Sequence, residues 1–156
     1  MKQAALFVFP ILFIVSSLFA GCEENNPANS DSLKINYGTS FGFCLGYCKQ
    51  EVDLSAAEIK FTKSGWGESV KTKTCTAPID NNEWSALVKS INYSEFARLE
   101  EVIGCPDCAD GGSEWIEIQA EDKKHRVTFE YGHEPEEVKA YIEVLRAYKN
   151  SFKNCD

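Results

Sequence analysis

Apolar and polar residues alternate along the first part of the folded region. Residues 33–37, 52–54 and 59–61 place an apolar side chain at every second position, which predicts β-strands with one buried face. The short run Ser55-Ala56-Ala57 is typical of a hairpin connection between the second and third of these strands. A fourth strand is expected in residues 69–79, which are rich in β-branched side chains and include a proline near the end.

The spacing of apolar residues then changes to that of a helix. Apolar side chains recur at intervals of three and four residues, at Trp84, Leu87, Val88 and Ile91. Asp80 followed by Glu83 is a helix start signal of the capping-box kind. Residues 94–104 continue as a shorter helical turn, with Phe96 and Leu99 on one side.

Alternation returns in residues 114–120 and 125–132, on either side of the polar turn 121–124. We expect a hairpin in which Ile116 and Ile118 lie across from Val127, Phe129 and Tyr131.

An amphipathic helix is expected to close the chain from Pro135, which suits a first helical position. Its buried stripe consists of Val138, Tyr141, Ile142, Leu145 and Phe152. The order of elements predicts an α+β domain: an antiparallel sheet of about five or six strands with two helices packed on one face.

The N-terminal residues 1–21 form a charged, apolar and then small-residue pattern that is typical of a secretory signal. "LFAGC" resembles the bacterial lipobox, with Phe19 where leucine is usual. The resemblance implies cleavage after Gly21 and acylation of Cys22, which would anchor the chain in a lipid membrane. An uncleaved membrane anchor and an ordinary signal peptide with a chance cysteine are the alternatives.

Residues 22–32 are polar and acidic, and predict a flexible tether ahead of a single domain at residues 33–156. Glu23 stands where an inner-membrane retention signal has aspartate, so the outer membrane of a bacterial envelope is favoured, with either face open. The net charge of −8 argues against a nucleic-acid partner.

Cysteine usage agrees with export to an oxidising compartment. Beyond Cys22 the chain has an even set of candidates for up to three disulfides, with 15 possible pairings: Cys44, Cys48, Cys75, Cys105, Cys108 and Cys155.

The stretch "GCPDCADGGSEW" at residues 104–115 admits several chemical interpretations. A thioredoxin-like centre needs a helix after its first cysteine, whereas here glycines and a strand follow, and Asp107 would disfavour a thiolate. Zinc could take four thiolates, from Cys44, Cys48, Cys105 and Cys108, but exported thiols tend to oxidise before they meet metal.

Calcium is a third interpretation, in which Asp107, Asp110 and Glu114 supply oxygens around Gly111 and Gly112. Their spacing is not that of an EF-hand, and aspartates before glycine are common turn residues. His125 and His133 are expected at a strand edge and in a loop. A disulfide-stapled turn is the simplest interpretation. No motif indicates an enzyme or a cofactor.

The runs "FGFCLGYC" and "CPDCADGGSEWIEI" resemble those of small bacterial lipoproteins that carry a domain of unknown function with a Cys-x3-Cys loop. The layout from "DGGSEWIEI" through the last helix also resembles that of emfourin, an inhibitor of protealysin-type metalloproteases. The first resemblance implies a lipid-anchored α+β domain, and the second an inhibitor.

We therefore expect a non-enzymatic protein-binding or inhibitor module whose partner is an envelope or secreted protein. Its contacts would come from cysteine-held loops near residues 38–48 and 104–114. The candidate contact residues are Phe41, Phe43, Tyr47, Asp107 and Asp110. The alternative is a zinc-binding or thiol-redox protein that uses the four cysteines named above.

Overall fold

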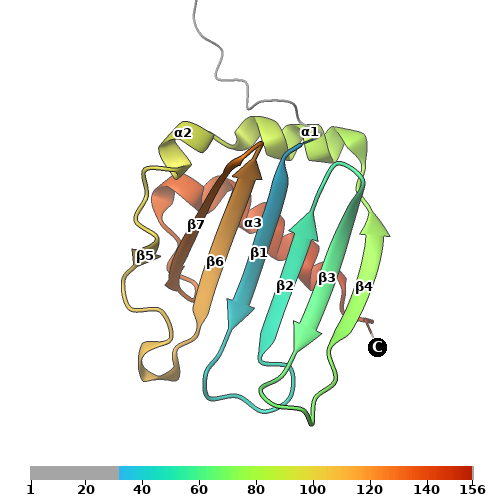
Figure 1. Ribbon diagram of the computed structural model, residues 1–156, viewed down its shortest axis with the longest axis vertical. Coiled ribbons are helices and arrows are strands. Elements are labelled where there is room, and N and C mark those ends of the chain that lie inside the picture. Colours follow the sequence, from blue (N-terminus) through green and yellow to red (C-terminus); the bar gives the residue numbers. More distant parts are fainter. Residues whose placement is uncertain (1–31, 156) are drawn as a thin grey trace, which may run out of the picture.

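The computed structural model describes residues 32–155 as one α+β domain, built on a seven-stranded sheet (Figure 1). The strands are β1 (Lys34–Ser40), β2 (Lys49–Leu54), β3 (Glu58–Ser64), β4 (Lys73–Pro78), β5 (Val102–Ile103), β6 (Ser113–Ala120) and β7 (Lys123–Glu130). The helices are α1 (Asn81–Ser90), α2 (Tyr93–Phe96) and α3 (Glu136–Ser151), with a 3-10 turn at Cys108–Asp110.

The sheet has the strand order β4-β3-β2-β1-β6-β7-β5. Strands β1 to β4 form an antiparallel meander, and the β6–β7 hairpin joins it by pairing β6 with β1. The short β5 pairs in parallel with β7. The α+β class is confirmed, but the expected count and arrangement are wrong: the sheet has seven strands rather than five or six, it is mixed rather than antiparallel, and three helices accompany it.

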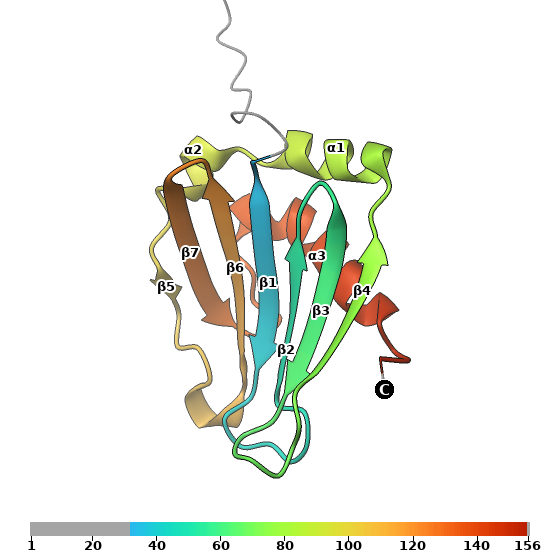
Figure 2. The ribbon, with the colours of Figure 1, turned by 45° about the vertical axis from the view of Figure 1, so that its right-hand side comes forward.

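Helix α3 lies across one face of the sheet, and α1 and α2 lie across one end (Figures 1 and 2). The fully buried side chains of this layer come from alternate positions of the central strands and from one stripe of α3. They include Ile35, Val52, Ile116, Val127, Val138, Ile142 and Leu145. Apolar positions repeat every second residue in the strands and about every 3.6 residues in the helix, and both sets of side chains therefore pack in one core.

The opposite face of the sheet is polar, and no helix within residues 32–155 covers it (Figure 1). At its centre Trp115 lies flat on Gly38, where an added Cβ would be 2.3 Å from the indole ring. The indole donates a hydrogen bond to Asn36 at 2.7 Å, and Arg126 and Lys49 lie over the ring at 4.6 and 5.5 Å. Trp115 is therefore buried without a second layer.

The predicted start signal of the first helix is confirmed. The Asp80 side chain accepts hydrogen bonds from the backbone of Asn82 and Glu83 at 2.8 and 3.2 Å, so it caps α1 as predicted.

The predicted hairpin forms with the turn shortened to Glu121 and Asp122. Ile116 pairs with Val127 as expected, but Ile118 lies opposite His125, and Tyr131 lies beyond the strand. Pro135 precedes the first turn of α3 rather than forming part of it.

None of the helices in residues 32–155 is long and apolar enough to span a bilayer. The predicted signal segment, Cys22 and almost all of the predicted tether lie outside the described residues.

Candidate functional site

Three loops gather at the end of the sheet away from α1 and α2: residues 41–48, 65–72 and 104–112 (Figures 1 and 2). We call this loop cluster the tip. The Trp66 indole donates a hydrogen bond to the Phe41 carbonyl at 2.8 Å, which joins the first two loops. The Asp107 carboxylate joins the first to the third, so the tip is one connected surface.

Disulfides close two of the three loops. Cys44 is bonded to Cys48 and Cys105 to Cys108, each with 5.5 Å between the Cα atoms. The third disulfide joins Cys75 to Cys155, outside the tip. One of the 15 pairings is thereby selected, and it places two of the three disulfides within loops predicted to make contacts.

Asp107 holds the tip together from inside. Its carboxylate accepts hydrogen bonds from the backbone N–H of Gly42 at 3.0 and 3.2 Å and from that of Gly112 at 3.1 Å. A carboxylate with several backbone donors serves as an internal clamp. Asp107, predicted as a contact residue, is therefore engaged within the protein, whereas Asp110 is exposed.

The backbone of the 104–112 loop is unusual. Asp107, Ala109 and Asp110 have φ angles of 59°, 52° and 60°, in the left-handed region that favours glycine. Aspartate tolerates this region better than alanine does, and such conformations persist only where the surroundings enforce them. The disulfide and the Asp107 hydrogen bonds supply that enforcement here.

Phe41 packs inward rather than outward. A Cβ at Gly112 would lie 2.4 Å from its ring, and the Tyr131 ring meets it edge-on with 5.0 Å between centroids. The only residue that fits beneath this ring is glycine. Phe41, which was also predicted to contact a partner, therefore mainly packs the first loop against the third.

Phe43 is the predicted aromatic that projects into solvent, with 85% of its surface exposed. Two apolar side chains that the sequence analysis missed accompany it: Leu45, at 101%, and Trp66, at 52%. A signal for both was present, since Leu45 stands between two closely spaced cysteines and Trp66 between two glycines, and neither setting is typical of a core position.

Tyr47, the last predicted aromatic, is half-buried at the flank of the tip. The Lys63 ammonium lies 4.6 Å from the centre of its ring, within cation–π range. Tyr47 thus faces β3 and the end of α3 rather than the exposed trio.

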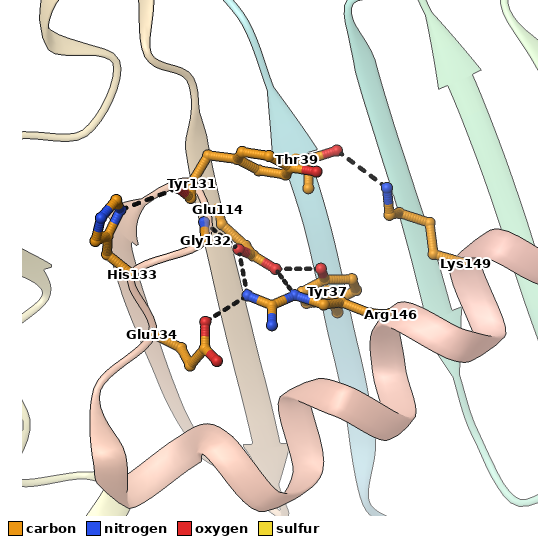
Figure 3. Close-up of polar contacts among 9 residues, drawn as sticks. All are labelled: Tyr37, Thr39, Glu114, Tyr131, Gly132, His133, Glu134, Arg146 and Lys149. Atoms are coloured by element: carbon orange, nitrogen blue, oxygen red, sulfur yellow. Dashed lines mark hydrogen bonds and ion pairs between the residues drawn. The ribbon is translucent and has the colours of Figure 1, made fainter.

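A buried polar network supports the tip from beneath (Figure 3). Glu114 on β6 is completely buried and accepts two hydrogen bonds from the Arg146 guanidinium of α3, both at 2.8 Å. It also accepts hydrogen bonds from the Tyr37 hydroxyl and from the backbone N–H of Gly132, the latter at 3.0 Å. The Gly132 turn follows Tyr131, so this network fixes the residue on which Phe41 rests.

Charge and burial set the ionisation of this network. Desolvation, reinforced by the hydrogen bond to Glu114, raises the pKa of Tyr37 far above its ordinary value and keeps the hydroxyl protonated. Arg146 also pairs with Glu134 at 2.6 Å, and this hydrogen bond lowers the pKa of the Glu134 carboxyl. Glu114, considered above as a calcium ligand, instead belongs to an internal ion pair.

The chemical alternatives find little support in this arrangement. With Cys44, Cys48, Cys105 and Cys108 paired in disulfides, no thiolate of theirs is available to zinc. No group of three or more potential metal ligands occurs in residues 32–155. His125 contacts the Leu99 carbonyl at 3.0 Å, and His133 the Tyr131 carbonyl at 3.2 Å, which places the two in different parts of the molecule.

Comparison of the chain with known protein families and with curated proteins finds no match. The arrangement of the tip is therefore the basis for a functional assignment.

Proposed function

We propose that this domain is a non-enzymatic protein-binding module that contacts its partner through the tip. One observation carries the proposal. Phe43 and Leu45 are exposed on a loop that a disulfide and the Asp107 carboxylate hold in place, and Trp66 is exposed on a neighbouring loop that its indole hydrogen bond joins to the first. Exposed apolar side chains scattered singly are ordinary, whereas a group of them on connected loops is typical of an interaction site.

The energetics favour such a use. Burial of apolar surface contributes about 25 cal/mol per Å², and aromatic anchors often dominate binding energy. Ordering flexible loops would offset part of this gain. Here the Cys44–Cys48 disulfide and the Phe41–Cys48 backbone hydrogen bond of 3.1 Å already close the loop that carries Phe43 and Leu45.

The direction of β1 suggests how the module would be presented. The strand runs from Lys34, at the end near α1, to Ser40, at the tip (Figure 2). If Cys22 is lipidated as the sequence predicts, the anchor joins the domain at the end opposite the tip. The tip would then face away from the anchoring membrane, toward an envelope or secreted protein. An inhibitor would be one form of such a module.

Site-specific photo-crosslinking in the full chain, within the producing bacterium, tests the proposal. A photoreactive phenylalanine analogue replaces Phe43, Leu45 or Trp66 in turn. Matched controls carry it at Val102 or Val144, which are 58% and 41% exposed and lie outside the tip. We expect the same protein adduct from the three tip positions and its absence from the two controls.

The double variant Phe43→Ala and Leu45→Ala completes the test with the probe at Trp66. We expect loss of the adduct with a thermal unfolding curve unchanged, because neither side chain packs in the core. Adducts that are equal at tip and control positions, or that persist in the double variant, would refute the proposal.

A further inference from the structure

The Cys105–Cys108 disulfide differs from the other two in its access to solvent. Both of its cysteines are exposed. Each of the other disulfides within residues 32–155 has one buried cysteine, Cys48 at 2% exposure and Cys155 at 3%. A thiolate that attacks a disulfide must reach one of its sulfur atoms, so Cys105–Cys108 is the disulfide most accessible to thiol–disulfide exchange.

A small pocket of about 130 Å³ lies beside this disulfide. Both cysteines line it, together with Glu130, Tyr131 and His133. Glu130 accepts a hydrogen bond of 2.8 Å from the backbone N–H of Cys105. His133 contacts the Tyr131 carbonyl at 3.2 Å (Figure 3). The pocket therefore has defined walls and leaves room next to the two cysteines for an approaching thiol.

The backbone around the disulfide favours its opening. Asp107 lies between the two cysteines, and Ala109 and Asp110 follow them, all three in the left-handed region. The loop at residues 44–48 also has a left-handed residue, but it is Gly46, which adopts this conformation without strain. Opening of the 104–112 loop would let its three non-glycine residues relax, and strain in the oxidised form makes a disulfide easier to reduce.

The same loop holds the tip together. The Asp107 carboxylate accepts hydrogen bonds from the backbone of Gly42 and Gly112. Because Asp107 directly precedes Cys108, the ring that the disulfide closes fixes its position. Once this ring opens, Asp107 is no longer held at Gly42, and the loop that carries Phe43 loses a support.

We propose that Cys105–Cys108 is a thiol–disulfide exchange site, and that its reduction by a protein dithiol loosens the tip. A thiolate of the dithiol attacks one sulfur atom and forms a mixed disulfide, while the other cysteine leaves as a thiolate and takes up a proton. The second thiolate of the reductant then displaces the first cysteine, which is protonated in turn. Two electrons and two protons pass to the disulfide, and the reductant becomes a disulfide itself. The exchange does not depend on the tip having a protein partner.

Equilibration of the full chain with mixtures of reduced and oxidised dithiothreitol tests the proposal. Samples are trapped by alkylation in denaturant, and peptide mass spectrometry identifies the cysteines that have reacted. We expect reduction of Cys105–Cys108 at a ratio of reduced to oxidised reagent at least about tenfold lower than the other two disulfides need.

Ala109→Gly tests the contribution of the backbone. Glycine removes strain from the closed loop, so Cys105–Cys108 should need a ratio roughly fivefold higher than in the unaltered chain. The matched control is Ala97→Gly, because Ala97 is also exposed but has an ordinary φ of −69°. This control should leave the ratio unchanged.

Amide hydrogen exchange measures the consequence for the tip. When this disulfide alone is reduced, we expect the N–H groups of Gly42 and Gly112 to exchange at least about tenfold faster, since their shared acceptor is released. The double variant Cys105→Ser and Cys108→Ser should show the same acceleration without reductant.

Reduction of the three disulfides at one ratio, or of Cys105–Cys108 last, would overturn the proposal. So would Gly42 exchange that is equal in the oxidised and reduced chains, or equal ratios for Ala109→Gly and Ala97→Gly. A tip that yields no crosslinked adduct would refute the proposed function instead and would leave these measurements unaffected.

Discussion

The three disulfides divide the molecule into a body and a tip that are stabilised differently. Cys75–Cys155 spans 80 residues of sequence and ties the chain after α3 to β4, so it constrains the whole domain. Cys44–Cys48 and Cys105–Cys108 span four and three residues and constrain only their own loops. The entropy removed from the unfolded chain grows with the length of the closed loop, so the first should dominate stability.

The tip and the body are therefore ordered by different interactions. The body owes its stability to a continuous apolar core and the Glu114–Arg146 pair. The tip has exposed apolar side chains, left-handed residues and two short disulfides. Its local order comes from these disulfides and from the Asp107 hydrogen bonds rather than from the apolar core.

The largest effect should come from the disulfide of the body. In the variant Cys75→Ser with Cys155→Ser, we expect the free energy of unfolding to fall by about 4.5 kcal/mol, the chain-entropy value for a loop of this length. Urea denaturation monitored by far-ultraviolet circular dichroism measures it. A loss no larger than that from removing a tip disulfide would abolish the distinction between body and tip.

The second effect concerns the buried ion pair. Glu114→Gln should lower the free energy of unfolding by about 3 kcal/mol, because Arg146 keeps its charge but loses its main partner in a buried setting. The control Glu136→Gln removes one side of the exposed pair with Lys139 and should cost less than about 0.5 kcal/mol. Similar losses for both variants would show that the network does not support the body.

Removal of a tip disulfide should have a smaller effect on stability. For Cys44→Ser with Cys48→Ser, we expect a loss of about 2 kcal/mol at most, from the same entropy relation applied to a short loop. Amide hydrogen exchange should accelerate in residues 41–48 and remain unchanged in β6 and β7. Acceleration that spreads through the sheet would mean that tip and body are not separable.

At low pH, protonation of Glu134 should lower the stability of the body. Because Arg146 lowers the pKa of this carboxyl in the folded state, its contribution is present above the unfolded pKa of about 4.3 and is lost as pH falls through the folded value. Glu134→Gln should therefore flatten the decline in stability below about pH 4.5, a small effect measurable by denaturation at several pH values. A steeper decline in this variant would contradict the assignment.

Much of the body could be predicted because its signals are local. The alternation of apolar positions predicted β1, β2, β3, β6 and β7. The Asp80 cap and the apolar stripe predicted α1. The prediction of a helical turn over residues 94–104 was wrong beyond Phe96, because Val102 and Ile103 form the strand β5 and are too few for a periodic pattern. Their strand character depends on parallel pairing with Thr128 and Phe129, a contact between distant parts of the chain.

The burial of Glu114 could also have been predicted from the sequence. Glu114 lies two and four residues before Ile116 and Ile118, so its side chain points to the same face of the strand and is buried with theirs. Arg146 follows Ile142 by four residues and thus lies near the buried stripe of α3. The disulfide pairing and the meeting of three loops at the tip, by contrast, depend on the order of strands in space, which local patterns do not encode.

The two-residue strand β5 has a consequence for association between copies of this protein. An unprotected sheet edge offers free backbone groups to another chain and can seed fibrous aggregates. Here β5 occupies part of the outer edge of β7, while β4, at the other edge, ends in Pro78 and is joined through Cys75 to Cys155. Only part of each sheet edge is therefore open to growth by strand addition.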